Sequence, residues 1–277
     1  MPMNEVFTPG RLKEYEDWLL QRRLSWNTIS TYMRTLQAVY NRLSPPGTPE
    51  HNPRLFDDVY TKVKSQIKRA LTEEQMGRLM HADLDVLSEE LQRVQAYFLL
   101  MFLFRGMPFI DLAHLRKRDV KDGKIAYRRH KTGKQITLRI PREALPLLKE
   151  FKDKDETSLY LFPILNAAPE GDDALYECYQ KALRNFNKML RVLAKRLLPG
   201  IKISSYTARH TWATLAYHIG MPIGIICQAL GHSSIRVTET YLKPFENEKV
   251  DKANRKLIST VKKHEGRSGR CFIYYKT

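Results

Sequence analysis

Cysteine is scarce in this chain, and long apolar runs are absent. The 277 residues include three cysteines, Cys178, Cys227 and Cys271, which are odd in number, widely spaced and without a Cys-x-x-Cys pair. This pattern excludes a disulfide framework and a cysteine zinc site, and it suits a reducing compartment. The longest apolar run, residues 97–104, is too short to span a bilayer. The first five residues show neither part of a secretory signal, so we expect a cytoplasmic protein without a membrane partner.

Motifs that hold nucleotides, catalytic zinc or acyl groups are also missing. The stretch Lys131-Thr132-Gly133-Lys134 lacks the upstream glycine and the following Ser or Thr of a phosphate-binding P-loop. No His-Glu-x-x-His, Gly-x-Ser-x-Gly or paired-glycine dinucleotide motif occurs. The sequence therefore gives no indication of a cofactor.

Acidic residues are outnumbered, with 30 Asp and Glu against 47 Lys and Arg, a formal net charge of +17. Such an excess causes self-repulsion that a polyanion relieves, so nucleic acid is the first partner to consider. The alternative is a soluble protein that is merely basic. The hydrophobic fraction of 43% is enough for real cores, and the length allows one large domain or two ordinary ones.

The first seventy residues are typical of a small helical unit. Two helices are predicted from apolar residues at helical spacing, and Asn27 stands where the second needs an N-cap. The other face of that second helix carries Arg34 and Arg42, which either follow a phosphate backbone or form an ordinary solvated face. The apolar positions are Leu12, Tyr15, Trp18 and Leu19 in the first helix, and Ile29, Tyr32, Met33, Leu36, Tyr40 and Leu43 in the second.

A basic linker is predicted to join this unit to a longer one. Lys62, Lys64, Lys68 and Arg69 lie in a stretch without periodicity, suited to lying along DNA. Thr72 then opens a new helix, with Gln75 as its capping-box partner. We therefore place the domain boundary between residues 1–69 and 70–277.

The second unit is predicted to be mainly helical with one β-hairpin. Residues 91–104 are apolar nearly all round and should form the central buried helix, which Gly106 and Pro108 end; Pro108 then begins the next helix. Two alternating stretches, 124–128 and 135–140, indicate a hairpin with a lysine-bearing turn. Further helices are expected at 142–152, 172–196, 207–219, 222–229 and 234–242, with Gly220 and Gly231 as stops.

Five residues suggest one reaction when read together: Arg105, Lys131, Arg209, His232 and Tyr241. Phosphoryl transfer at a DNA phosphodiester needs a nucleophile, a proton donor for the leaving 5′ oxygen, and fixed positive charge on the non-bridging oxygens. Arginine forks match the phosphate oxygens, lysine can protonate the leaving oxygen, and histidine can donate to the phosphate or shuttle a proton. A tyrosine nucleophile keeps the energy of the broken link in a phosphotyrosyl ester, so that neither ATP nor metal is required.

The residues around these positions resemble the tyrosine recombinase, or phage-integrase-type, family. The likeness lies in Ala208-Arg209-His210-Thr211-Trp212-Ala213-Thr214, in Leu230-Gly231-His232-Ser233-Ser234, and in Thr238 with Tyr241-Leu242. It implies a two-domain DNA clamp, with an N-terminal SAM-like core-binding domain and a catalytic domain. It also implies strand cleavage and rejoining through a 3′-phosphotyrosine, by a homo-tetramer on paired double-stranded DNA sites. Association with the nucleoid and DNA-bending accessory proteins would accompany such an activity.

Two departures from the family pattern affect the site. The family's first arginine falls at Pro108, which cannot contact a phosphate in this way, so we assign its role to Arg105, one helical turn earlier. The rivals are Arg116 and Arg118, which look more like a surface turn or a backbone contact. Tyr206 stands at the family's histidine position and can donate a hydrogen bond to phosphate, although it is a poor base at neutral pH.

Alternative assignments remain for several positions. Lys134 is as close to the hairpin turn as Lys131 and is a second DNA-contacting lysine. Tyr206 is a rival nucleophile, and His210 is expected to pack or hydrogen-bond beside Arg209. At the level of function, a type IB topoisomerase-like enzyme and a DNA-binding relative that has lost catalysis are the alternatives.

The ends of the chain give weaker predictions. Residues 245–257 form a charged segment with little apolar surface, which in the family packs on a neighbouring protomer. Residues 263–277 have no assignment. The helical unit begins almost at residue 1, so we expect no additional arm-binding domain.

Overall fold

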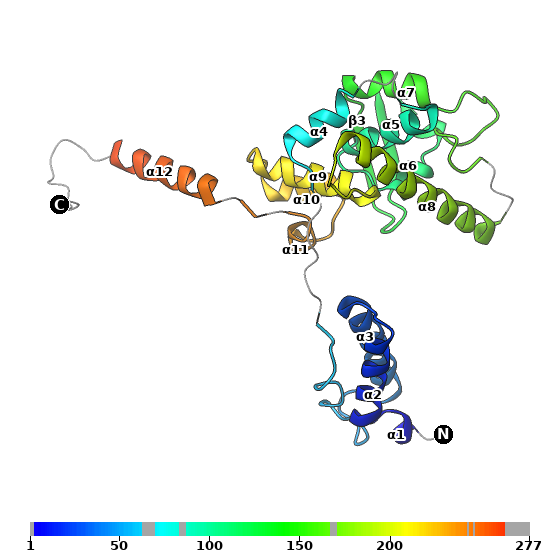
Figure 1. Ribbon diagram of the computed structural model, residues 1–277, viewed down its shortest axis with the longest axis vertical. Helices are drawn as coiled ribbons and strands as arrows, with labels where there is room; N and C mark the ends of the chain where they lie inside the picture. Colours follow the sequence, from blue (N-terminus) through cyan, green and yellow to red (C-terminus); the bar gives the residue numbers. More distant parts are fainter. Residues whose placement is uncertain are drawn as a thin grey trace. The chain divides into compact units, whose positions relative to one another are not determined.

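The computed structural model describes residues 3–62, 70–82, 87–166, 171–242, 244–245 and 247–263 (Figure 1). The chain divides into two compact units, Met1–Ile67 and Lys68–Thr277. Within the described ranges no helix is both long and apolar enough to cross a membrane. Of the predicted linker residues, Lys64, Lys68 and Arg69 fall outside the described residues, as do Cys271 and the unassigned end from residue 264.

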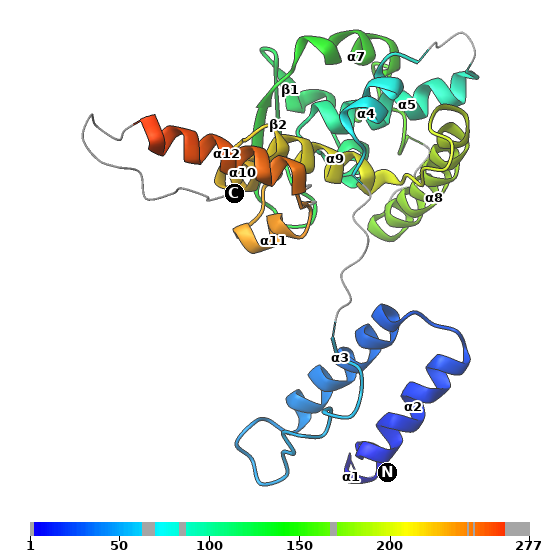
Figure 2. The same ribbon diagram turned by 60° about the vertical axis from the view of Figure 1, so that its left-hand side comes forward.

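The first unit is built on an antiparallel helix pair, α2 (Pro9–Gln21) and α3 (Trp26–Leu43), preceded by the short α1 (Met3–Val6) (Figure 2). The two helices bury their apolar stripes against a following loop, because each helix alone leaves such a stripe in water. The core consists of Leu12, Leu19, Ile29, Met33, Tyr40, Leu55, Phe56 and Val59.

Several details of this unit differ from the sequence prediction. The N-cap of α3 is Ser25, whose hydroxyl accepts the Thr28 N–H at 3.2 Å, so the prediction of Asn27 is wrong. Trp18, Tyr32 and Leu43 are exposed, because the buried stripe is narrower than the apolar pattern suggests. Glu16 takes the central buried position on α2, where its carboxylate accepts the Tyr60 N–H and pairs with Lys13.

The second unit is organised around α5 (Glu89–Leu103), which packs against α4, α6, α7, α8 and α9. The predicted central helix and the Thr72–Gln75 capping box are both confirmed. The other helices of the described residues are α4 (Glu73–Met80), α6 (Phe109–Ala113), α7 (Leu145–Phe151), α8 (Asp172–Leu197), α9 (Ser205–His218), α10 (Ile223–Leu230), α11 (Ile235–Glu239) and α12 (Asn247–Lys263).

The predicted hairpin is present as β2 (Lys124–Arg128) and β3 (Gln135–Arg139), which pair antiparallel with Tyr127 opposite Ile136. A two-residue strand, β1 (Val120–Lys121), extends the sheet in the order β1-β2-β3 and was not predicted. Two 3₁₀ turns, η1 (Lys117–Asp119) and η2 (Arg142–Ala144), flank the sheet. The hairpin residues that face inward are Ile125, Tyr127, Ile136 and Leu138.

The ends of α6 and α11 affect the placement of predicted site residues. Pro108 is the N-cap of α6 and not its first residue, and α6 ends at Ala113. Helix α11 ends at Glu239, so Tyr241 lies beyond it and not within it. The stops at Gly220 and Gly231 are confirmed, with φ of +89° and +67°.

Gly231 gives a first testable prediction. A Cβ at this residue would lie 2.7 Å from Cδ1 of Ile136 and 2.8 Å from Cδ of Arg129. Gly231→Ala is therefore expected to lower the free energy of unfolding by about 1–2 kcal/mol for the left-handed backbone and by about 1–3 kcal/mol more for the clash.

The matched control for this prediction is Gly220→Ala, where φ is also positive but no atom lies within 4 Å of the added Cβ. Gly220→Ala should lose only the share of the free energy of unfolding that comes from the left-handed backbone. Urea denaturation of both variants measures the difference, and equal losses would show that the packing around Gly231 yields without cost.

Candidate active site

Three residues predicted to act together lie together in the second unit. Arg209 is on the second turn of α9, His232 follows the Gly231 stop of α10, and Tyr241 follows α11. The Nη2 atom of Arg209 lies 2.9 Å from Nε2 of His232, and the His232 and Tyr241 rings stack at 5.0 Å. The Arg209 guanidinium is 5.4 Å from the centre of the Tyr241 ring.

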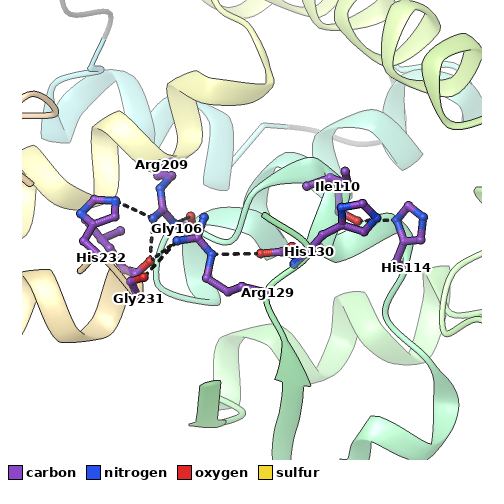
Figure 3. A network of polar contacts seen from close by, with 10 residues as sticks. Gly106, Ile110, His114, Arg129, His130, Arg209, Gly231 and His232 are labelled. Atoms are coloured by element: carbon purple, nitrogen blue, oxygen red, sulfur yellow. Dashed lines mark hydrogen bonds and ion pairs between the residues drawn. The ribbon is translucent and has the colours of Figure 1, made fainter. Parts of the chain in front are cut away.

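Arg209 is almost completely buried and is held by backbone carbonyls. Its Nη1 donates to the Gly106 oxygen at 2.8 Å and its Nη2 to the Leu230 oxygen at 2.6 Å (Figure 3). Gly106 allows this approach, because a Cβ there would lie 3.1 Å from Cα of Arg209. Burial and the charge of Arg129 lower the pKa of Arg209, while the Tyr241 phenol raises it. An arginine stays charged under these influences, so the site carries fixed positive charge.

Tyr241 is half-buried and its backbone is fixed by two neighbouring segments. Its N–H donates to the Thr238 oxygen at 2.9 Å, and its own carbonyl accepts from the Thr214 hydroxyl at 3.2 Å. The His210 ring is tilted against the Tyr241 ring with their centres 4.7 Å apart, and its Nδ1 lies 3.4 Å from the Tyr241 carbonyl oxygen. His210 thus packs beside the tyrosine, and the phenol ring contacts two imidazoles.

His232 is held as a neutral imidazole. Burial, with the charges of Arg209, Arg129, Lys131 and Lys134, lowers the pKa of His232 to about 4. Because Arg209 can only donate, Nε2 of His232 accepts from it, and Nδ1 therefore carries the proton that is donated to the Thr238 hydroxyl at 2.9 Å. The ring is oriented by these two bonds.

This arrangement predicts a pH dependence of stability. Above about pH 6.5 the imidazole is neutral in both the folded and the unfolded chain. Between about pH 6.5 and about pH 4 only the unfolded chain binds the proton. The free energy of unfolding should therefore decrease as the pH is lowered through this range, by up to about 3 kcal/mol. His232→Gln should remove this share of the slope.

The measurement is denaturant unfolding of both proteins at several values between pH 7 and pH 4.5. His81→Gln, at an exposed position at the end of α4, is the control. The lowered pKa of His114, caused first by burial, adds a slope of the same sign to every variant. An unchanged slope in His232→Gln would mean that the native state accepts a proton at this ring.

The sequence prediction missed a buried pair beside this group. Arg129 donates from Nη1 to the oxygens of Leu230 and Gly231, at 3.0 and 3.3 Å, and its Nε lies 3.5 Å from Oδ2 of Asp111 (Figure 3). The other Asp111 oxygen accepts the His130 N–H at 2.9 Å. Burial raises the pKa of Asp111, and the His130 N–H and Arg129 oppose that rise. The alternation of β2 gave a usable signal, because Arg129 continues the inward series of Ile125 and Tyr127.

The residues at the two departures from the family pattern lie at the edge of the group. Arg105 is half-buried with φ of +59°, and its charge acts on the Tyr127 phenol together with those of Arg129 and Arg209. Tyr206 is 58% exposed on the first turn of α9. Pro108, Tyr206 and Arg209 line a common small cavity of about 40 Å³.

The remaining predicted cations are exposed. Lys131 and Lys134 lie in the hairpin loop, whose base is closed by the Arg129 N–H donating to the Lys134 oxygen at 2.9 Å. In the first unit Arg34, Arg42 and Lys62 are exposed, and Arg116 and Arg118 are exposed in the η1 turn. No group of three or more potential metal ligands was found within the described ranges.

A family comparison decides what this group of residues belongs to. The model described as the phage integrase family matches residues 69–248, which include α9, the His232 turn and Tyr241. The chain belongs to the phage integrase family. Its members are the tyrosine recombinases, so the resemblance stated from the motifs is confirmed.

Individual relatives agree with this family. The tyrosine recombinase XerA of Pyrococcus furiosus is 28% identical over 248 residues, covering 86% of this chain and 79% of its own length. A tyrosine recombinase of Thermosipho africanus is 23% identical, covering 81% of this chain and 74% of its own.

Solved structures show the same fold at lower identity. The Tn1549 transposon integrase in complex with transposon right-end DNA aligns with a TM-score of 0.62 at 16% identity, over 93% of this chain and 87% of its own. XerH recombinase bound to a palindromic difH substrate aligns with a TM-score of 0.63 at 16% identity, over 89% and 69%. The mainly helical integrase fold with a small sheet is therefore confirmed.

Proposed function

We propose that this protein is a site-specific DNA recombinase of the integrase or invertase type, which breaks and rejoins strands through a 3′-phosphotyrosine. The observation that supports this most directly is the contact of Arg209 with His232 and the Tyr241 ring. Fixed cationic donors next to a phenol are what attack on a phosphodiester requires. Membership of the tyrosine recombinase family supports the same reaction.

In the proposed step Oη of Tyr241 forms a bond to the scissile phosphorus as the bond to the 5′ oxygen breaks. The phenolic proton is released to water, and the leaving 5′ oxygen takes its electron pair and a proton from Nζ of Lys131. Arg209 and Arg105 hold the non-bridging oxygens, and Tyr206 donates a hydrogen bond from the edge of the site. His232 can accept a proton once a phosphate anion raises its pKa. Rejoining reverses these transfers, with neither metal nor ATP.

Trapping of the covalent intermediate tests the proposal. A suicide duplex with a nick beside the cleavage position loses its short 5′-hydroxyl fragment, so the phosphotyrosyl adduct accumulates. The native site is to be taken from the DNA flanking the gene. We expect a protein–DNA band that survives denaturant and disappears after protease digestion. Wild-type protein that binds the site yet never forms this band would contradict the proposal.

Binding is proposed to use both units as a clamp on double-stranded DNA, with the first unit as the core-binding domain of residues 1–69 and the catalytic domain at 70–277. Arg34, Arg42 and Lys62 on the first unit, with Lys64, Lys68, Arg69 and the hairpin Lys134, are the proposed backbone contacts. Such contacts release counterions, so affinity should fall steeply with salt.

Assembly is proposed to be a tetramer on paired sites, with possible DNA-bending accessory proteins. Helix α12 supports this, because Val250, Leu257 and Ile258 are exposed on it, at 52%, 62% and 46%. A helix with exposed apolar residues gains stability by packing on another surface. Electrophoresis of the trapped complex without denaturant measures its stoichiometry.

One observation favours a second candidate, a DNA-binding relative without catalysis. Pro108 removes the first arginine of the family pattern, and Tyr206 replaces its histidine. That protein would bind the site with the same salt dependence but give no adduct. A type IB topoisomerase-like enzyme would instead form adducts on, and relax, supercoiled plasmid that lacks the site.

A further inference from the structure

Arg129 occupies a buried position inside the candidate active site and has no role in the proposed cleavage step. It follows β2, and its backbone is fixed by the hairpin loop through the Lys134 oxygen and the Gly133 N–H. Its side chain is 7% exposed, whereas Arg128 before it and Lys131 after it are exposed. The hairpin therefore places one buried cation, Arg129, against the turn that carries His232.

The guanidinium groups of Arg129 and Arg209 meet at one atom. Nη1 of Arg129 and Nη2 of Arg209 both donate to the Leu230 oxygen, at 3.0 and 2.6 Å. Each group also keeps a buried Nε without a hydrogen-bond acceptor, and the two bonds that Arg129 donates to carbonyl oxygens both come from Nη1. Two like charges this close are unfavourable unless an anion accompanies them.

The chain itself supplies little negative charge for this pair. Asp111 lies 3.5 Å from Arg129, and it is the only acid that contacts either guanidinium among the described residues. The sequence contains no Asp or Glu between Glu177 and Glu239, the stretch that holds α9, α10 and the His232 turn. With His232 neutral, the group has a net charge of +1 when Asp111 is ionised. A phosphodiester would supply the missing negative charge.

Asp111 also connects Arg129 to the position that departs from the family pattern. Pro108 and Asp111 stand at the start and the middle of the same short helix, α6. Helix α6 therefore has no cation at residue 108, but its Asp111 pairs with a cation from the hairpin, Arg129. The carboxylate sets the direction of Arg129 through Nε and fixes the base of the loop that carries Lys131 through the His130 N–H.

We propose that Arg129 is a catalytic residue that donates from Nη2, which neither carbonyl bond uses, to a non-bridging oxygen of the scissile phosphate, with Asp111 as its positioning residue. This rests on the proposed strand-cleavage function. Arg129 exchanges no proton in the step. It stabilises the charge that builds on the phosphate while the bond from Tyr241 forms and the bond to the 5′ oxygen breaks.

The test compares two substrates in the adduct assay, a suicide duplex with a phosphodiester at the cleavage position and the same duplex with a methylphosphonate. The methylphosphonate replaces one charged oxygen with a neutral methyl group, so a guanidinium that neutralises that oxygen is no longer needed. Arg129→Met should slow adduct formation by about 10²- to 10³-fold on the phosphodiester and stay within about tenfold of wild type on the methylphosphonate. Asp111→Asn should show a smaller loss with the same recovery.

Arg128→Met, one residue earlier and exposed, is the matched control and should leave both rates unchanged. Arg129→Lys, which keeps the charge without the fork, replaces Arg129→Met should that variant not fold. Equal losses on both substrates would make Arg129 a structural residue and overturn the proposal. Wild type without adduct on either substrate would overturn the strand-cleavage function as well, so the two failures are distinguishable.

Discussion

Tyr241→Phe is expected to abolish the covalent DNA adduct and to leave folding and DNA affinity unchanged. Phenylalanine keeps the ring that packs against His210 and His232, and the backbone bonds to Thr238 and Thr214 do not involve the hydroxyl. The substitution removes the oxygen that would attack phosphorus together with its interaction with the Arg209 guanidinium, and a phenyl ring cannot act as a covalent nucleophile.

Tyr206→Phe is the control, because Tyr206 is the rival nucleophile on the first turn of α9. It should retain adduct formation, with a moderate loss if its hydroxyl bonds the phosphate. Adduct rates on the suicide duplex and affinities from gel mobility decide between the two tyrosines. An adduct that persists in Tyr241→Phe and disappears in Tyr206→Phe would transfer the nucleophile to residue 206.

Arg209→Met is expected to reduce the rate of adduct formation by about 10²- to 10³-fold, by comparison with removal of one oxyanion donor. Affinity for the site should fall by less than about tenfold, since binding is spread over many phosphates. Arg209 lies against the Tyr241 ring, next to the proposed nucleophile. Its charge should therefore stabilise the transition state of the attack more than it stabilises the bound DNA.

Stability has to be measured beside the rate, since Arg209 also holds the Gly106 and Leu230 carbonyls. Arg209→Lys retains charge at the site and serves as a second variant. Arg191→Met is the matched control; that arginine is exposed on α8 and, among the described residues, bonds only to the Asn187 carbonyl of its own helix. An affinity loss as large as the rate loss would assign Arg209 to binding and not to the reaction.

Local signals predicted much of the fold. Thr72 with Gln75, the apolar helix α5, the alternation of β2 and β3, and the stops at Gly220 and Gly231 each depend on near neighbours in sequence, so they could be read directly. Ser25 and not Asn27 caps α3, a choice that depends on how far the helix extends. The burial of Glu16 could not be predicted, because its partner is the N–H of Tyr60 in a distant loop.

The residues of the candidate site also fall into two groups, those that could be predicted from near neighbours in sequence and those that could not. Arg209, His232 and Tyr241 could be found because they recur in order on one short stretch of chain. Arg129 and Asp111 could not be paired from sequence, because their contact joins a strand end to a short helix. A single arginine after a strand is more often solvated than buried. The inward period of β2 would have placed Arg129 inside, but only the fold shows what it meets there.

The carbonyl oxygen of Leu230 has a consequence for the energetics of the two guanidinium groups. Because both donate to this one acceptor, removing either leaves the other with the oxygen to itself and relieves the repulsion between the two charges. Residues that share a partner in this way respond non-additively to substitution. The double variant should therefore lose more than the product of the two single losses, which makes the pair one thermodynamic unit.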